Sequence, residues 1–194
     1  FFIEIFDLED LKDIQNFTST KKINFCILGE GSNVVLPNLL NKFVIKISFN
    51  EISIEDNLIT VGAGKNWDDF VLWYLENGYC GLENLSGIPW SNGAAPIQNI
   101  GAYGVEIKDV FVSCSGYSLN TIEKKKFKLN DCQFSYRSSI FKKSLRNQFI
   151  ITEVVLQLSK TNHKISKSYN SIKDAMNKKK IQNPTIKDIA SIVS

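Results

Sequence analysis

The sequence predicts a globular protein that combines several short strands with a few helices around one long glycine-rich loop. Three observations predict it: short apolar segments that run into glycines, a polar-capped helix with one apolar face, and a late segment whose apolar residues partly alternate. The apolar fraction is 43% and the charged fraction is 22%, ordinary values for globular domains. With 194 residues the chain can bury a core in one or two domains, so disordered and fibrous classes are excluded.

The first half of the chain alternates predicted strands with two predicted helices. The strands are expected at Phe1–Ile5, Ile23–Leu28, Phe43–Ile47 and Leu58–Val61. Asp7 is expected to cap the first helix, because leucines and an isoleucine follow it at helical spacing. Asn66 is expected to cap the second helix, whose acidic first turn suits the positive end of the helix dipole and which ends at Gly78.

The second half of the chain predicts further strands and a change of composition near its end. The strands are expected at Val110–Tyr117, Lys126–Leu129 and Phe149–Leu158, and the last alternates in part, as an antiparallel strand with one covered face does. Beyond Lys160, residues His163–Lys180 are polar and rich in lysine, whereas Thr185–Val193 has a helical pattern. The single histidine, His163, lies among polar neighbours and is expected to be exposed and inert.

Charge and cysteine spacing exclude several classes of function. The cysteines are widely separated without a C-x-x-C pair, which predicts reduced core thiols and no metal site: Cys26, Cys80, Cys114 and Cys132. The net charge is only +3 and most lysines are diffuse, so no nucleic-acid partner is expected. Since no segment has the length of a membrane span or the pattern of a signal peptide, we expect a cytoplasmic protein with no membrane partner.

The glycine-rich loop is the stretch Gly81–Glu106, which contains five glycines and two of the four prolines. Its many apolar residues argue against disorder. One interpretation is an ordered loop whose glycines let the backbone approach a bulky ligand and offer it free N–H groups. The alternative is a long packed turn in an antiparallel protein.

Two shorter segments carry candidate binding groups. Gly29–Asn33 follows a predicted strand directly and forms a tight turn, which is either an anion-binding nest or an ordinary turn, since the third glycine of a dinucleotide fingerprint is absent. Arg137 lies between Tyr136 and two serines, and apolar residues flank the segment. It is either a surface charge or a two-pronged clamp for a carboxylate or phosphate.

Five motifs together closely resemble one family, the UDP-N-acetylenolpyruvoylglucosamine reductases (MurB), flavoenzymes of peptidoglycan precursor synthesis. The motifs are L-G-E-G-S-N-V at Leu28–Val34, V-G-A-G at Val61–Gly64, G-L-E-N-L at Gly81–Leu85, P-I-Q-N-I-G-A-Y-G-V-E at Pro96–Glu106 and F-S-Y-R-S-S-I-F-K at Phe134–Lys142. The match runs from about Phe1 to Leu158 in the family's order and spacing. Each motif alone is weak, but five in register are highly specific.

The resemblance implies an α+β architecture, a two-subdomain FAD-binding fold of the PCMH type followed by a substrate domain. Residues 1–64 would form the first subdomain and residues 65–160 the second, with FAD between them. Residues 161–194 would be the start of a third domain that is largely missing. No metal is implied.

The resemblance also implies a set of site residues. The pyrophosphate turn would be Gly29, Glu30, Gly31, Ser32 and Asn33. The other side of the flavin would be lined by Gly93, Ala95, Pro96, Gln98, Asn99, Gly101, Ala102 and Tyr103. Arg137 would be catalytic, stabilising negative charge that develops on the substrate carboxylate. Tyr136, Arg137 and Tyr169 would contact the substrate.

The implied reaction is that of UDP-N-acetylmuramate dehydrogenase. NADPH would reduce FAD, and the hydride would then pass to the enolpyruvyl double bond of UDP-N-acetylglucosamine enolpyruvate.

The chain departs from the family pattern in three places. Trp90 stands where the family has a glycine, and its side chain would either obstruct the cofactor or point outward. The Gly-Asn-Ala-Gly-Ser stretch with its proton-donating serine and the C-terminal glutamate are absent from the sequence, as is the N-terminal Asn-Thr-Phe region.

We therefore expect catalysis to be impaired in this chain, and three interpretations stay open. It is a reductase whose third domain comes from elsewhere, such as a separate chain; a non-catalytic FAD-binding module; or a decaying gene product that folds poorly.

Overall fold

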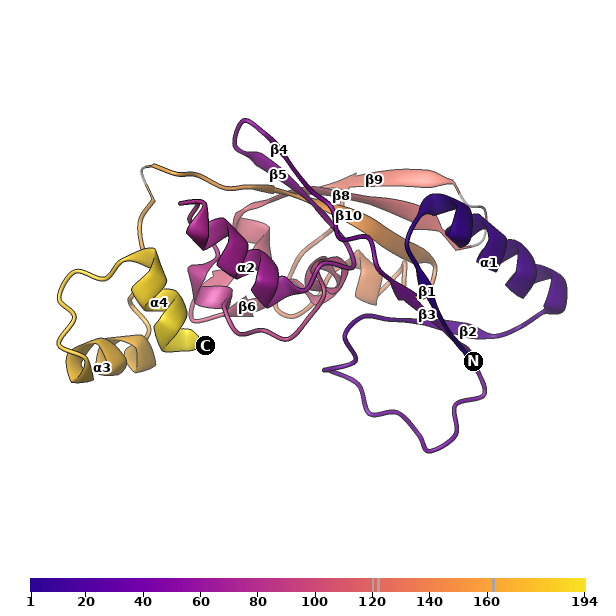
Figure 1. Cartoon of the computed structure of the whole chain (residues 1–194), viewed down its shortest axis with the longest axis horizontal. Coiled ribbons are helices and arrows are strands. Elements are labelled where there is room, and N and C mark those ends of the chain that lie inside the picture. Colours follow the sequence, from indigo (N-terminus) through magenta and orange to yellow (C-terminus); the bar gives the residue numbers. More distant parts are fainter. Residues whose placement is uncertain (120, 122, 162) are drawn as a thin grey trace.

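The computed structural model of the chain describes residues 1–119, 121, 123–161 and 163–194. Its elements form a small sheet with one helix beside it, a larger sheet, the glycine-rich loop against the larger sheet, and a helical pair at the C-terminus (Figure 1). Among the described residues, no helix has the length and apolar character needed to cross a bilayer.

The small sheet is parallel and has the strand order β1-β3-β2, formed by Phe2–Ile5, Phe43–Ile47 and Phe25–Leu28. Strands β1 and β2 lie parallel on either side of β3, and α1 (Leu8–Lys21) forms the crossover that connects them. The Asp7 carboxylate accepts hydrogen bonds from the amides of Glu9 and Asp10 at 2.8 and 2.9 Å, so the predicted cap is confirmed. Lys22, at φ 52°, ends the helix.

The larger sheet is antiparallel and has the order β4-β5-β10-β8-β9. Its strands are Ile52–Glu55, Leu58–Gly62, Phe149–Gln157, Phe111–Ser118 and Lys124–Lys128. Strand β10 is central, and Val154 lies in register between Val61 and Cys114, all three fully buried. Strand β4 was not predicted, because I-S-I-E is short and faces solvent along most of its length.

The glycine-rich loop is ordered, as its apolar residues predicted, but it is not structureless. It contains the 3₁₀ helices η1 (Glu83–Leu85) and η2 (Asn92–Gln98) and the hairpin β6–β7 (Gly101–Ala102 and Val105–Glu106). A further 3₁₀ turn, η3, follows at Ile107–Asp109.

Helix α2 (Trp67–Glu76) ties this loop to the core. The side chain of Asn66 caps it by accepting a hydrogen bond from the amide of Asp69 at 3.1 Å, as predicted. The indole N–H of Trp67 is buried and donates to the carbonyl oxygen of Leu85 at 2.9 Å, which fixes η1 against the helix. Trp67 is therefore a packing residue.

The C-terminal segment forms α3 (Asn170–Lys178) and α4 (Ile186–Val193), and α4 lies against η1 (Figure 1). The sequence predicted α4 but not α3, whose few apolar residues are hidden in a lysine-rich stretch. Ile172 and Met176, one turn apart, bury themselves against Ile189 in a small separate core.

The four cysteines are free, and Cys80, Cys114 and Cys132 are buried thiols as predicted. Cys26 is only half-buried on β2. The prediction of a core thiol is therefore wrong at Cys26.

Candidate functional site

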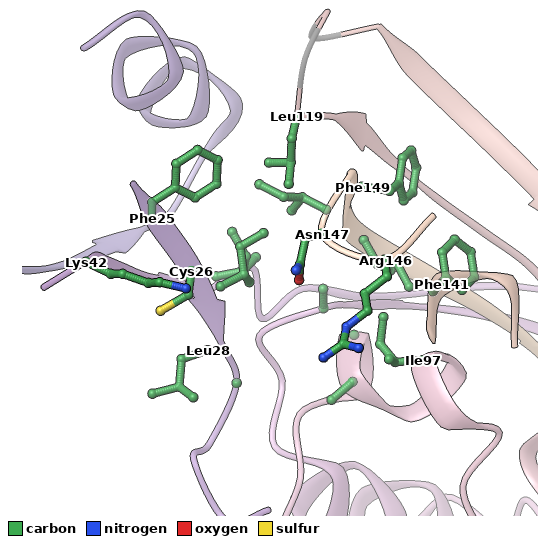
Figure 2. A pocket seen from close by; sticks show the side chains of 18 of the residues that line it. Phe25, Cys26, Leu28, Lys42, Ile97, Leu119, Phe141, Arg146, Asn147 and Phe149 are labelled. Atoms are coloured by element: carbon green, nitrogen blue, oxygen red, sulfur yellow. The ribbon is translucent and has the colours of Figure 1, made fainter. Parts of the chain in front are cut away.

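A cavity of about 850 Å³ lies between the small sheet and the larger sheet. Strand β2 forms one wall, and the opposite wall comes from η2, the 3₁₀ turn η4 (Ile140–Lys142) and the start of β10. Figure 2 shows apolar side chains from both walls, among them Phe25, Leu119 and Phe149. A bulky ligand with flat rings could therefore bury its apolar parts here.

The charge of this cavity has one sign. Lys22, Lys42, Lys142 and Arg146 line it, whereas no aspartate or glutamate does among the residues that the structure describes. Lys42 extends into the cavity from the β2 side and Arg146 from the turn that precedes β10 (Figure 2). Cations gathered in a cleft without carboxylates attract anionic ligands.

A second cavity of about 280 Å³ adjoins the first and contains the Gly29–Asn33 turn in its wall. The two cavities share lining residues, including Gly29, Ser91 and Lys142. Gly31 has φ 74°, a conformation that favours glycine. Among the described residues, none accepts a hydrogen bond from the amides of residues 29–33. This turn therefore offers unpaired donors, which is what an anion-binding nest requires.

Two glycines of the cavity walls lie close to neighbouring segments, Gly29 to Ser91 and Gly93 to Ala63 after β5. A Cβ atom on Gly29 would lie 2.8 Å from Ser91 Oγ, and one on Gly93 would lie 2.6 Å from Ala63 Cβ. Real Cβ contacts are not that short. The missing side chain of Gly93 thus lets η2 pack against the residue that follows β5, and that of Gly29 lets the turn pack against Ser91.

The predicted site residues of the glycine-rich loop between Gly93 and Asn99 separate into two groups. Gly93 and Gln98 line the cavities, whereas Ala95, Pro96 and Asn99 are buried behind them. The amide of Gly93 donates to the carbonyl oxygen of Ala63 at 2.8 Å. The expectation that this loop offers free N–H groups is therefore wrong at Gly93, because that amide holds the loop to the larger sheet.

Asn99 fastens the loop to its neighbours. With φ 47°, it donates a side-chain hydrogen bond to the carbonyl oxygen of Ser135 at 3.2 Å and accepts one from the amide of Lys108 at 3.2 Å. It thereby joins η2 to the segment that carries Arg137.

A second cluster lies around the β6–β7 hairpin and contributes to neither cavity: Gly101, Ala102, Tyr103, Tyr136, Arg137 and Tyr169. Arg137 is exposed, with φ 50°, in a turn that Ser135 and Ser138 close with reciprocal hydrogen bonds of 3.0 and 3.1 Å. The pKa of the Glu106 carboxyl on β7 is lowered, first by its hydrogen bond with Lys108 and to a smaller extent by the Arg137 charge. The Arg137 charge therefore acts on a carboxyl of this hairpin.

The tyrosines of this cluster differ in their surroundings. Tyr103 and Tyr169 pack edge to face, with ring centroids 5.6 Å apart. Tyr136 is 84% exposed beside Arg137 in the chain. An arginine next to an exposed aromatic ring can bind a carboxylate while the ring shields it.

Trp90 is half-buried and forms part of the wall of the smaller cavity. Beside it, the hydroxyl of Ser32 donates a hydrogen bond to the carbonyl oxygen of Pro89. The indole therefore neither fills the cavity nor leaves the protein, so it is compatible with a ligand in the cavity.

Sequence reasoning missed Lys42, Arg146 and His163. Lys42 and Arg146 each stand shortly before a predicted strand, and a search for cations at strand entries would have found them. The expectation that His163 is inert is wrong, since its imidazole is paired with the buried carboxylate of Glu83. A buried carboxylate needs such a partner.

Comparison with known proteins agrees with these features. Residues 1–119 match the model of the FAD binding domain family. The chain belongs to this family. Its curated relatives include UDP-N-acetylenolpyruvoylglucosamine reductases of Flavobacterium johnsoniae, 45% identical over 99% of this chain and 58% of that protein, and of Amoebophilus asiaticus, 42% identical over 94% and 55%. The chain thus spans somewhat more than half the length of these relatives.

Solved structures show the same fold. The crystal structure of the UDP-N-acetylenolpyruvylglucosamine reductase (MurB) of Thermus caldophilus superposes with a TM-score of 0.67 at 23% identity, covering 95% of this chain and 64% of that one. A more distant likeness is alkyldihydroxyacetonephosphate synthase, with a TM-score of 0.58 at 14% identity over 81% of this chain and 31% of that one. The predicted α+β FAD-binding fold and the resemblance to MurB are confirmed.

Proposed function

We propose that this chain binds FAD across the two adjoining cavities and forms the flavin-binding part of a UDP-N-acetylmuramate dehydrogenase. The observation that carries the proposal is the pairing of an unpaired amide nest with the larger, basic cavity, which no carboxylate lines among the described residues. In the adjoining smaller cavity, which contains the nest, the described lining includes one carboxylate, that of Glu30. FAD has both matching parts, an anionic pyrophosphate and two flat ring systems. Gly29 lines both cavities and Gly93 lines the larger one, so backbone without side chains borders the proposed cofactor at both positions.

In this proposal each group of residues has a separate task. The amides of Gly29–Asn33 hold the pyrophosphate, and Gly93 and Gln98 border the bound cofactor. Ala95, Pro96 and Asn99 support that wall from behind. Residues 1–64, 65–160 and 161–194 correspond to the two flavin-binding subdomains and the start of the substrate domain.

The hairpin cluster is the proposed substrate side. When bound, FAD would supply hydride transfer, taking hydride from NADPH and passing it to the enolpyruvyl double bond of UDP-N-acetylglucosamine enolpyruvate. Arg137 would be catalytic, because its charge stabilises the enolate character that develops on the substrate carboxylate. Tyr136 and Tyr169 would bind the substrate, and Tyr103 would border the flavin next to them. The proton donor is not among the residues we assign.

The proposed setting is the cytoplasm, where NADPH and the nucleotide sugar are available. A complete reaction would need the groups that the relatives' remaining length provides, in this proposal from a further segment or a separate chain.

The visible absorbance spectrum of the purified chain, with and without added FAD, tests the proposal. We expect a bound-flavin spectrum that survives gel filtration, and we expect riboflavin, which lacks the pyrophosphate, to bind more weakly. No flavin band in excess FAD would refute it.

A second candidate is a non-catalytic FAD-binding module, which the match of residues 1–119 to the FAD binding domain family would also fit. It predicts flavin retention without substrate-dependent oxidation of the reduced flavin. The third interpretation, a poorly folding relic, predicts a low, uncooperative melting transition.

A further inference from the structure

The chain that leaves β10 runs along the start of the glycine-rich loop, and we call its residues 159–161 and 163–169 the strap. At the first contact, the carbonyl oxygen of Ser159 accepts hydrogen bonds from the amide and the thiol of Cys80 at 2.9 and 2.7 Å. The ammonium of Lys160 then lies 4.5 Å from the ring centroid of Tyr79. The strap therefore starts out fastened to the residues just before η1.

Further contacts join later residues of the strap to η1 and to the β6–β7 hairpin. The side-chain amide of Asn84 donates to the carbonyl oxygen of Ser166 at 2.9 Å. Tyr169 then packs on Tyr103, which lies at the turn of the β6–β7 hairpin. The strap thus ends with its last side chain at the proposed substrate side.

The central contact joins Glu83 of η1 to His163. The Glu83 side chain is only 1% exposed, and its Oε2 accepts a hydrogen bond from the amide of Gly81 at 2.9 Å. Its other oxygen contacts Nε2 of His163, a side chain that is 24% exposed. Among the described residues, His163 is the basic side chain that pairs with this carboxylate.

The other titratable groups that face Glu83 do not compensate its charge. Burial first, and then the Glu83 carboxylate, raise the pKa of the Tyr74 hydroxyl and of the Cys80 thiol, so both stay neutral. Removing one partner of a buried pair leaves an uncompensated charge, which is strongly unfavourable. Glu83 therefore holds His163 in place, and through it the strap.

We propose that Glu83 and His163 form a latch that fastens the strap to η1 and so holds Tyr169 against Tyr103. His163 is then a positioning residue. The latch is independent of the proposed function. Only the interpretation of Tyr169 as a residue held at the substrate side rests on that function.

Amide hydrogen exchange, followed peptide by peptide without flavin, tests the latch. In His163→Ala we expect amides of the strap to exchange roughly tenfold faster, while β10 and α2 exchange as in the wild type. Lys164→Ala is the matched control, since Lys164 is an exposed neighbour whereas His163 is the residue that pairs with Glu83, and it should leave the exchange unchanged. Unchanged strap exchange in His163→Ala would overturn the latch.

A double variant separates the latch from the cost of a stranded charge. Glu83→Leu combined with His163→Ala removes the buried carboxylate, so we expect melting to recover while the strap still exchanges fast. If the strap regains its protection in the double variant, the effect of His163→Ala came from the unpaired charge alone and the proposal fails.

A spectroscopic signature completes the test. The chain has a single histidine, so its ring resonances in an NMR spectrum are unambiguous. Glu83→Gln should shift them, and Glu76→Gln on exposed α2 surface should not; a ring that ignores Glu83→Gln would contradict the pairing. Flavin retention is measured separately on the same variants and should not change, so failure of FAD binding and failure of the latch are distinguishable.

Discussion

Replacing Gly93 with alanine would place a methyl group 2.6 Å from Ala63 Cβ and 3.1 Å from the Ala63 carbonyl oxygen. Carbon atoms in contact prefer about 3.5–4.0 Å, so either η2 or β5's end must move by about 1 Å. Overpacking of this kind costs about 1–3 kcal/mol. For a chain of this size, each kcal/mol shifts the melting temperature by about 2–4 °C. We therefore expect Gly93→Ala to melt several degrees lower.

A second substitution that compensates the first tests whether the clash with Ala63 causes the loss of stability. Adding Ala63→Gly to Gly93→Ala removes the clashing Cβ, and we expect the double variant to regain most of the lost melting temperature. Ala63→Gly alone should cost about 1 kcal/mol or less through backbone entropy. Thermal unfolding by circular dichroism measures all four proteins, and a flavin titration reports the cavity wall. A Gly93→Ala protein that melts like the wild type, or a double variant that melts lower still, would refute the close approach.

Three further predictions concern the cavity, the hairpin and a helix cap. Arg146→Gln should weaken FAD binding by roughly two- to fivefold and reduce the salt dependence of binding, because an exposed charge contributes up to about 1 kcal/mol. Flavin fluorescence titration measures the affinity of this variant and of the control variant Lys143→Gln. The pKa of Glu106 is lower in the folded than in the unfolded state, so its carboxylate stabilises the fold above the unfolded pKa, and this stability is lost as the pH falls through the folded pKa. Lys108→Met should therefore reduce the loss of stability at acidic pH, measured by denaturant titrations at several acidic pH values. An unchanged pH profile would contradict the pairing of Glu106 with Lys108. Asn66→Ala should destabilise the protein by about 1 kcal/mol in the same assay, whereas Asn66→Asp should restore the cap.

The sequence predicted correctly those elements that are determined by interactions between residues close together in the chain. Asp7 and Asn66 predicted helix starts correctly because a cap is a contact between a side chain and the next turn. The same holds for the Gly29–Asn33 turn, whose glycines and position after an apolar strand sufficed to suggest an anion nest. Strand β4 and helix α3 escaped prediction because their few apolar residues become meaningful only against β5 and α4.

The candidate site was only partly accessible in this way. The motif-derived residues separate in space into a cavity group and a hairpin group, a division that the sequence does not contain. Gly93 illustrates why. Its amide donates to Ala63, and a Cβ atom added to it would lie 2.6 Å from Ala63 Cβ, a contact that depends on a distant segment of the chain.

By itself the sequence determined that this is an ordered α+β protein of a flavin-binding family, because periodicity, caps and motif spacing are properties of neighbouring residues. Only the tertiary structure decided that Lys42 and Arg146, far apart in the chain, line one cavity where the described lining includes no carboxylate, and that His163 pairs with the buried carboxylate of Glu83. Electrostatic fields and burial depend on distances in space, and those distances exist only once the sheets and the strap have packed together.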